Sequence, residues 1–260
     1  MSQHLREGAK AGAPGPRQSY AETVRSLSAA QKAAAPGAPA YSLFVNRRAG
    51  RYLAAACHRL GLGPNAVSAV SAVFTYGAIV LLATAAPAWP MAVAVWLMLA
   101  VGYAFDSADG QVARLRGGGS LAGEWLDHVL DSIKLSTLHL ALAVCAYRFF
   151  DLPDAGWLLV PLGFCVVANV SFFAMILNDQ LKARHTLGTG NALPKRTGSR
   201  LRSVLLIPTD YGFLCLVFLL IPLTEVFLVV YTALLFLNAA HLFLAAPKWF
   251  RDFSRLEASA

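Results

Sequence analysis

The chain has 260 residues, of which 57% are hydrophobic and only 14% are charged, whereas soluble domains carry about 25% charged residues. Several apolar runs approach the roughly 20 residues that a helix needs to cross a bilayer. The composition therefore excludes an ordinary soluble protein and indicates one that spans the membrane several times. The formal net charge of +8 could suggest nucleic acid, but the basic residues gather on one side of the apolar runs, so we expect no nucleic-acid partner.

The first part of the chain has two predicted regions. Residues 1–40 are polar and rich in Ala, Gly and Pro, so we expect a disordered cytoplasmic tail. In residues 41–62, apolar side chains recur at helical spacing and arginines take most of the other face. This pattern predicts an amphipathic helix that lies along an anionic membrane surface. A plain soluble helix with a charged face is the alternative.

Residues 63–248 predict six transmembrane helices. Their expected ranges are 67–86, 91–114, from the end of the GGGS turn at 117–120 to 147, 156–177, 204–221 and 226–245. A polar loop is expected from 178 to 203, and 249–260 is expected to be a short cytoplasmic tail. The predicted fold class is therefore an all-α integral membrane protein with six transmembrane helices, preceded by an amphipathic interfacial helix.

The basic residues predict the orientation. Of the 22 Lys and Arg residues, all but Arg148 and Lys134 fall on the same side of the six predicted spans. Cytoplasmic loops carry such an excess of positive charge. We therefore expect a multi-pass protein of the cell membrane, with both termini and the acidic stretch at residues 106–131 on the cytoplasmic side.

Four carboxylates lie in residues 106–131, and the helical spacing predicts how they are arranged. Asp106 and Asp109 are three residues apart and Asp127 and Asp131 are four apart, so each pair shares a helix face. The RGGGS turn at 116–120 brings the two helices together. Buried membrane carboxylates usually serve function or pair with a cation. Because few cations lie near, the sequence predicts a site for two divalent metal ions, Mg²⁺ or Mn²⁺.

This stretch reads D-x2-D-G-x2-A-R-x8-G-x3-D-x3-D. It resembles, at all eight fixed positions, the signature of the CDP-alcohol phosphotransferase family. Members of that family are integral membrane enzymes that cleave a CDP-linked donor, release CMP and pass the phosphoryl-linked group to an alcohol. A bare DxxD would be a weak signal, since many helices contain one by chance.

The resemblance implies roles for individual residues. It implies that Asp106, Asp109 and Asp127 bind metal, and that Asp131 both contacts metal and acts as the general base. It also implies a homodimer in the membrane and a set of residues that bind the donor. These donor-binding residues are Asn65, Ser68, Gly110, Ala113, Arg114, Ser120 and Gly123.

The acceptor pocket is less well marked. Lys134 lies one turn beyond Asp131, where it could receive an acceptor phosphate; a simple ion pair with Asp131 is the alternative. Lys195 and Arg200, in the predicted 178–203 loop, would suit an anionic acceptor such as inositol phosphate or glycerol phosphate, and ordinary cytoplasmic positive charge is the alternative for each.

Several functional readings remain open at this stage. The chain length and six predicted spans resemble family members that use CDP-diacylglycerol and a small polar alcohol. A soluble CDP-alcohol donor with a lipid or polyol acceptor is the first alternative. A prenyltransferase would need a second Asp-rich motif beside the first, and the DxxD that follows Asp131, Asp151 to Asp154, lies in the predicted 148–154 loop on the opposite side of the membrane. A transporter or metal-binding scaffold is the non-enzymatic alternative.

Overall fold

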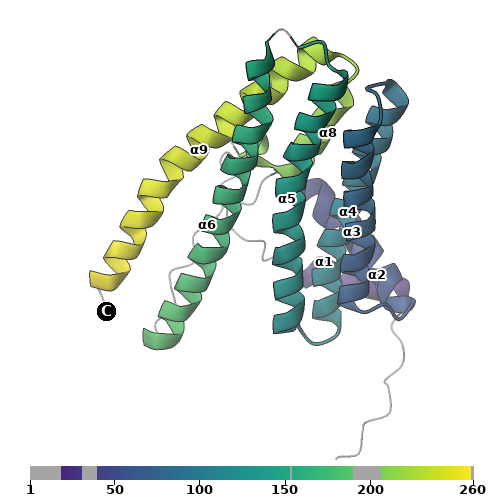
Figure 1. Cartoon of the computed structure of the whole chain (residues 1–260). Coiled ribbons are helices and arrows are strands. Elements are labelled where there is room, and N and C mark those ends of the chain that lie inside the picture. Colours follow the sequence, from purple (N-terminus) through teal and green to yellow (C-terminus); the bar gives the residue numbers. More distant parts are fainter. Residues whose placement is uncertain (1–18, 31–39, 153, 190–205, 259–260) are drawn as a thin grey trace, which may run out of the picture.

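A computed structural model describes residues 19–30, 40–152, 154–189 and 206–258, and these residues are almost entirely helical (Figure 1). Five of the helices are long and apolar enough to cross a membrane. They are α3 (Pro64–Thr84), α4 (Trp89–Leu115), α5 (Leu121–Phe149), α6 (Leu159–Thr189, preceded by a 3-10 turn at Ala155–Leu158) and α9 (Thr224–Ala258). The prediction of an all-α membrane protein is confirmed.

The count of six transmembrane helices is not confirmed. Within the predicted fifth span, 204–221, the described residues form a short helix α8 (Tyr211–Val217) and a 3-10 turn (Phe218–Leu220). Together these are shorter than the roughly 20 residues that cross a bilayer. Asp210 begins α8 by accepting a hydrogen bond from the Gly212 N–H at 2.9 Å, so the helix starts inside the predicted span.

Two helices run further than predicted. The prediction of a polar loop from residue 178 is wrong up to Thr189, because α6 continues to that residue. Likewise, α9 passes Pro247 and continues to Ala258, through most of the predicted 249–260 tail. The polar residues that follow each apolar run are adequate helix formers. A change in polarity therefore marks where the apolar surface ends, and the helix itself continues.

The prediction of a disordered 1–40 tail is wrong for residues 20–30, which form α1 (Tyr20–Ala30). A capping box begins this helix: the Ser19 N–H donates to Glu22 Oε2 at 2.7 Å, and the Glu22 N–H donates to Ser19 Oγ at 3.3 Å. Hydrogen bonds from Ser19, from its backbone first, lower the pKa of Glu22. Leu27 is buried, and the Tyr20 hydroxyl donates to Tyr52 O, so α1 packs on the next helix.

That next helix matches the predicted 41–62 segment. It starts with a π-helical turn (Ser42–Asn46) and continues as α2 (Arg47–Arg59). Gly50, Ala54 and Cys57 are buried, whereas Tyr52 and Leu60 are exposed. A Cβ added at Gly50 would lie 2.8 Å from Ser107 Oγ. The small residues therefore let α2 pack closely against α4, and large apolar side chains remain on the outer surface.

The helices α3 and α4 pack closely together near the carboxylates. Ser71 Oγ donates to Gly102 O at 2.8 Å. A Cβ added at Gly102 would collide with Thr75 Oγ1 and lie 3.2 Å from Ser71 O. Glycine at this position lets the two helix backbones approach, which brings the polar side chains of α3 next to α4.

A larger core lies where α5, α6 and α9 meet. His139 is fully buried, stacks on Phe164 with ring centroids 4.4 Å apart, and shares a 2.6 Å hydrogen bond between its Nδ1 and the Tyr231 hydroxyl. Phe227 stacks on Tyr231 at 5.4 Å. We call His139, Phe164, Phe227 and Tyr231 the aromatic core.

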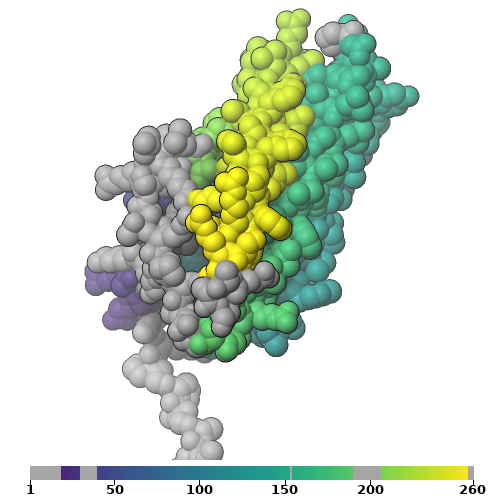
Figure 2. Space-filling view, turned by 90° about the vertical axis from the view of Figure 1, so that its left-hand side faces the viewer, coloured from purple at the N-terminus to yellow at the C-terminus, as the bar shows by residue number. Residues whose placement is uncertain are grey.

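The outer faces of α6 and α9 are apolar. Figure 2 shows α9 as a continuous ridge down one face of the molecule, with α6 beside it. Phe173 on α6 and Phe236, Phe243 and Leu244 on α9 are exposed. Large exposed apolar side chains on helices of this length are what a surface in contact with lipid requires.

Candidate active site

The turn between α4 and α5 sets how the two carboxylate-bearing helices meet. Gly117 and Gly118 adopt φ angles of 97° and 129°, which glycine reaches without steric cost. Arg116 Nη2 donates to Gly61 O at 2.8 Å and to Leu62 O at 3.0 Å, so the turn is tied to the α2–α3 connection. Ser120 then caps α5 by accepting a hydrogen bond from the Gly123 N–H at 3.0 Å.

Three of the four carboxylates form a cluster. Asp106 and Asp109 on α4 and Asp127 on α5 each offer an oxygen atom, and these atoms all lie within 4.8 Å of one another. Hard divalent cations prefer oxygen ligands of this kind. The donor set therefore fits Mg²⁺ or Mn²⁺, as the helical spacing predicted for these three residues.

Asp109 is the most constrained of the three. Its side chain is buried, Ser68 Oγ donates to Oδ2 at 2.5 Å, and the Gly110 N–H lies 2.5 Å from Oδ1. These hydrogen bonds satisfy the buried carboxylate and fix its orientation. Ser68, predicted as a donor-binding residue, is thus also a partner of a metal-binding candidate.

Asp131 lies beside this cluster and is paired with Lys134. The two side chains form an ion pair and hydrogen bond, and Lys134 Nζ also lies 4.0 Å from Asp106 Oδ2. The Lys134 side chain is buried. The ion pair that the sequence left open as one reading of Lys134 is present, and it places a positive charge between the two helices.

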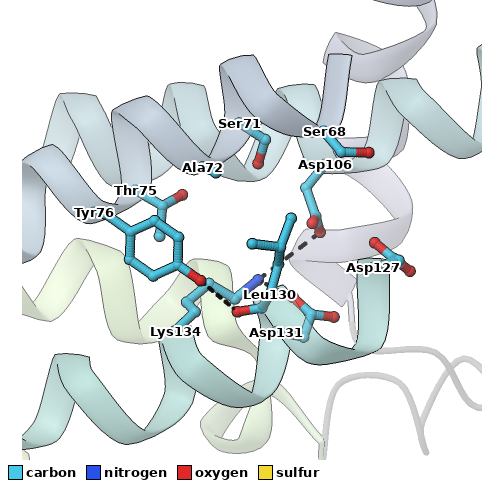
Figure 3. A pocket seen from close by; sticks show the side chains of 10 residues that line it. All are labelled: Ser68, Ser71, Ala72, Thr75, Tyr76, Asp106, Asp127, Leu130, Asp131 and Lys134. Carbon is cyan, nitrogen blue, oxygen red and sulfur yellow. Dashed lines mark hydrogen bonds and ion pairs between the residues drawn. The ribbon is translucent and has the colours of Figure 1, made fainter. Parts of the chain in front are cut away.

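Asp106, Asp127, Asp131 and Lys134 line one pocket, which Figure 3 shows from close by. Tyr76 crosses it and donates from its hydroxyl to Leu130 O at 2.8 Å. The wall comes from α3, α4 and α5, and its residues are Ser68, Ser71, Ala72, Thr75, Tyr76, Asp106, Asp127, Leu130, Asp131 and Lys134.

Of the four hydroxyl-bearing residues of this pocket, the sequence analysis named Ser68 and missed the other three. Ser71, Thr75 and Tyr76 line it together with Ser68. Ser68, Ser71 and Thr75 recur at intervals of three and four residues, so they form a polar stripe on one face of an otherwise apolar helix. That stripe was the available signal, because an apolar helix surrounded only by lipid has no need for it.

The other predicted donor-binding residues lie outside the pocket wall. Gly110 is exposed, and nothing lies within 4 Å of a Cβ added there. Ala113 is buried and Arg114 is exposed. Asn65 lies near Ser120 and Gly123, since a Cβ added at Gly123 would be 3.4 Å from Asn65 Oδ1 and 3.1 Å from Ser120 Oγ. The acceptor candidates Lys195 and Arg200 lie outside the described residues.

One comparison with known proteins matches the chain. The family model described as CDP-alcohol phosphatidyltransferase matches residues 62–245. This range runs from the end of the α2–α3 connection into α9 and contains the whole pocket wall. No curated protein matches the chain.

Proposed function

Since this match extends over well more than half of the chain, the protein belongs to the CDP-alcohol phosphatidyltransferase family and is a transferase, and we propose that it moves a phosphatidyl group from CDP-diacylglycerol to a small polar alcohol. CMP is the other product. The observation that carries the proposal is that the Asp106, Asp109 and Asp127 cluster lies beside the Asp131–Lys134 pair, at a pocket that all of these residues except Asp109 line.

The four carboxylates would hold the metal. Asp106, Asp109 and Asp127 supply oxygen atoms from two helices, and Asp131 lines the same pocket. When bound, a pair of Mg²⁺ or Mn²⁺ ions would neutralise the negative charge of a diphosphate. The hydrogen bond from Ser68 holds Asp109 in the orientation that such binding needs.

Asp131 is the proposed general base. The acceptor hydroxyl oxygen forms a bond to the phosphorus that carries the diacylglycerol group, and the bond from that phosphorus to the bridging oxygen breaks. The leaving oxygen goes with CMP, and the hydroxyl proton goes to Asp131. An ionised carboxylate is a weak base, so most of its effect comes from its position beside the acceptor.

The substrates would contact residues around this centre. For the CDP part of the donor we propose Asn65, Ser68, Gly110, Ala113, Arg114, Ser120 and Gly123. The open space at Gly110 supports this, because a nucleotide can approach the backbone there. For an anionic acceptor, such as inositol phosphate or glycerol phosphate, we propose Lys134 in the pocket and the cytoplasmic residues Lys195 and Arg200.

The membrane setting completes the proposal. In Figure 1 the α4–α5 turn, the end of α6 and the end of α9 lie at the same end of the molecule. We place this end on the cytoplasmic side of the cell membrane, since the Lys and Arg residues concentrate there. The 41–62 helix would lie on that membrane surface, and the active protein would be a homodimer.

The test is CMP release by the purified full chain with Mg²⁺ or Mn²⁺ and CDP-diacylglycerol. Inositol phosphate, glycerol phosphate, serine and inositol are offered as acceptors. We expect release with one acceptor, and a loss of about 10²–10⁴-fold in Asp131→Asn, which is the usual contribution of a general base.

A matched control is Asp154→Asn, because Asp154 caps the 3-10 turn before α6 and asparagine can keep that cap. It should retain full activity. Release that starts only when a soluble CDP-alcohol replaces CDP-diacylglycerol would show that the donor is of the other class. If no CDP compound yields CMP, the proposed reaction is wrong.

A further inference from the structure

Lys134 contacts an aromatic ring as well as the carboxylates. Its Nζ lies 4.8 Å from the centroid of the Tyr211 ring, over the ring face. The same nitrogen is paired with Asp131 and lies 4.0 Å from Asp106 Oδ2. A cation over an aromatic face is attracted by the ring quadrupole, most strongly where water is excluded. Lys134 is buried, so its position is determined by these three neighbours.

Tyr211 is itself held by its own helix cap. It is the first residue of α8, directly after Asp210. Asp210 is 2% exposed and accepts hydrogen bonds from the Gly212 N–H at 2.9 Å and from the Ser42 N–H at 3.0 Å. One carboxylate therefore joins the start of α8 to the helical turn that precedes α2.

Two more aromatic side chains fix this junction. Tyr103 on α4 meets the Tyr211 ring edge to face, with centroids 5.1 Å apart and an angle of 77°. The Tyr41 ring fills the space where a Cβ on Gly212 would stand. Tyr211 thus lies among α4, α8 and the segment before α2, and its ring has little freedom to move away from Lys134.

We propose that Tyr211 is a positioning residue, anchored by Asp210, that fixes the Lys134 ammonium between Asp131 and Asp106. Its effect on the reaction is indirect, because it acts through Lys134. The inference rests on the proposed function in one respect, which is that the carboxylate cluster binds a divalent cation. A fixed positive charge beside the cluster lowers its affinity for such a cation and holds the Asp131 carboxylate in one orientation.

The test is a double-mutant cycle on Mn²⁺ affinity, measured by electron paramagnetic resonance on the purified full chain without substrate. Lys134→Met should bind Mn²⁺ about tenfold more tightly, because it removes a unit charge next to the ligands. Tyr211→Leu should bind it about threefold more tightly, because Lys134 can then move away. The double variant should bind Mn²⁺ as tightly as Lys134→Met alone, because Tyr211 acts through Lys134.

Three further variants separate positioning from a general effect on folding. Tyr211→Phe keeps the ring face and should match the wild type. Phe213→Leu removes a ring of similar size from the same helix, at a residue that packs against the large core, and should also match. Asp210→Asn keeps an acceptor for the Gly212 N–H and weakens the link to Ser42, so it should shift affinity in the direction of Tyr211→Leu. If Tyr211→Leu does not fold, Asp210→Asn takes its place in the cycle.

Several outcomes would overturn the proposal. An effect of Tyr211→Leu that persists in full in the Lys134→Met background would mean that Tyr211 does not act through Lys134. Equal affinities in wild type and Tyr211→Leu would also refute it, as would a wild-type protein that binds no Mn²⁺. The CMP assay is separate: a cycle with the expected couplings in a protein that releases no CMP would leave this inference standing and refute the proposed reaction.

Discussion

The helix α5 contributes to two buried polar groups that differ in charge. In its first half, Asp127, Asp131 and Lys134 line the pocket together with Asp106 of α4, and Asp109 of α4 lies in the same carboxylate cluster. Further along, the buried His139 faces α9 and shares a single 2.6 Å hydrogen bond with Tyr231. One helix thus contributes both to a charged group of four carboxylates and one lysine and to a neutral group of an imidazole and a phenol.

The surroundings of the two groups differ in the same way. Aromatic rings enclose the His139–Tyr231 pair, with Phe164 stacked at 4.4 Å. The pocket is lined by the hydroxyl groups of Ser68, Ser71 and Thr75. A neutral pair among rings has no charge to desolvate, so burying it costs less than burying a net negative cluster. A net negative cluster costs stability, which supports the proposal that a bound cation completes this site.

The largest effect is expected from a substitution that weakens metal binding by the carboxylate cluster and leaves the aromatic core unchanged. Asp109→Asn keeps the size of the side chain and can keep the hydrogen bond from Ser68. We expect Mn²⁺ affinity to fall by about a hundredfold, because a charged ligand is lost. The melting temperature without metal should not fall, since a buried like charge is removed. Isothermal titration and thermal unfolding in the same detergent measure the two quantities. A lower melting temperature with unchanged Mn²⁺ affinity would mean that Asp109 supports packing rather than cation binding.

An intermediate effect is expected from a substitution that removes a hydrogen bond from the aromatic core and leaves the pocket unchanged. Tyr231→Phe keeps the ring and removes the hydroxyl that His139 Nδ1 contacts. The free energy of unfolding should fall by about 1–3 kcal/mol, the cost of a buried polar atom left without its partner. Mn²⁺ affinity of the folded protein should stay at the wild-type value.

The matched control for this change is Tyr147→Phe, which removes a hydroxyl from a tyrosine that is 78% exposed and should alter nothing. If Tyr231→Phe weakened Mn²⁺ binding as strongly as Asp109→Asn, the two groups could not be treated as independent.

The smallest expected effect lies outside both groups, in α1. Ser19→Ala removes half of the capping box, so protection of the α1 amides against hydrogen exchange should fall about fivefold. In the wild type, the pKa of Glu22 is lowered by its hydrogen bonds to Ser19. The stabilisation from this pair is therefore present above the ordinary pKa of a glutamate and is lost as the pH falls through the lowered value. A loss of protection that spreads to α4 or α5 would show that α1 supports the pocket.

Much of the fold followed from periodicity and length. The long apolar runs of α3, α4 and α5 and the helical spacing of Asp106, Asp109 and Asp127 depend on local pattern, and the structure has them near the predicted positions. Helix ends beyond the apolar runs were harder to predict. Residues after Leu177 are polar, yet helical hydrogen bonds continue to Thr189, because backbone geometry does not depend on contact with lipid.

Other features were hidden for different reasons. The Ser19 and Glu22 capping box was visible as S-x-x-E, but the composition of residues 1–40 pointed to disorder as a whole. The contact between Lys134 and Tyr211 joins residues on α5 and α8 that are far apart in the chain. No local pattern marks such a tertiary contact, so only the folded arrangement could show that Lys134 has an aromatic neighbour.

The junction of Tyr41 and Ser42 with Asp210 and Gly212 also constrains how the protein is made. The ribosome synthesises the chain from the N-terminus to the C-terminus, so the segment before α2 emerges long before Asp210 has been synthesised. The first helices and all four carboxylates can already be inserted while the hydrogen bond from the Ser42 N–H still has no acceptor in Asp210. The wall of the pocket is therefore synthesised before the aromatic neighbour of Lys134, and a nascent chain that stops before α8 contains every acidic residue of the pocket but lacks the ring beneath Lys134.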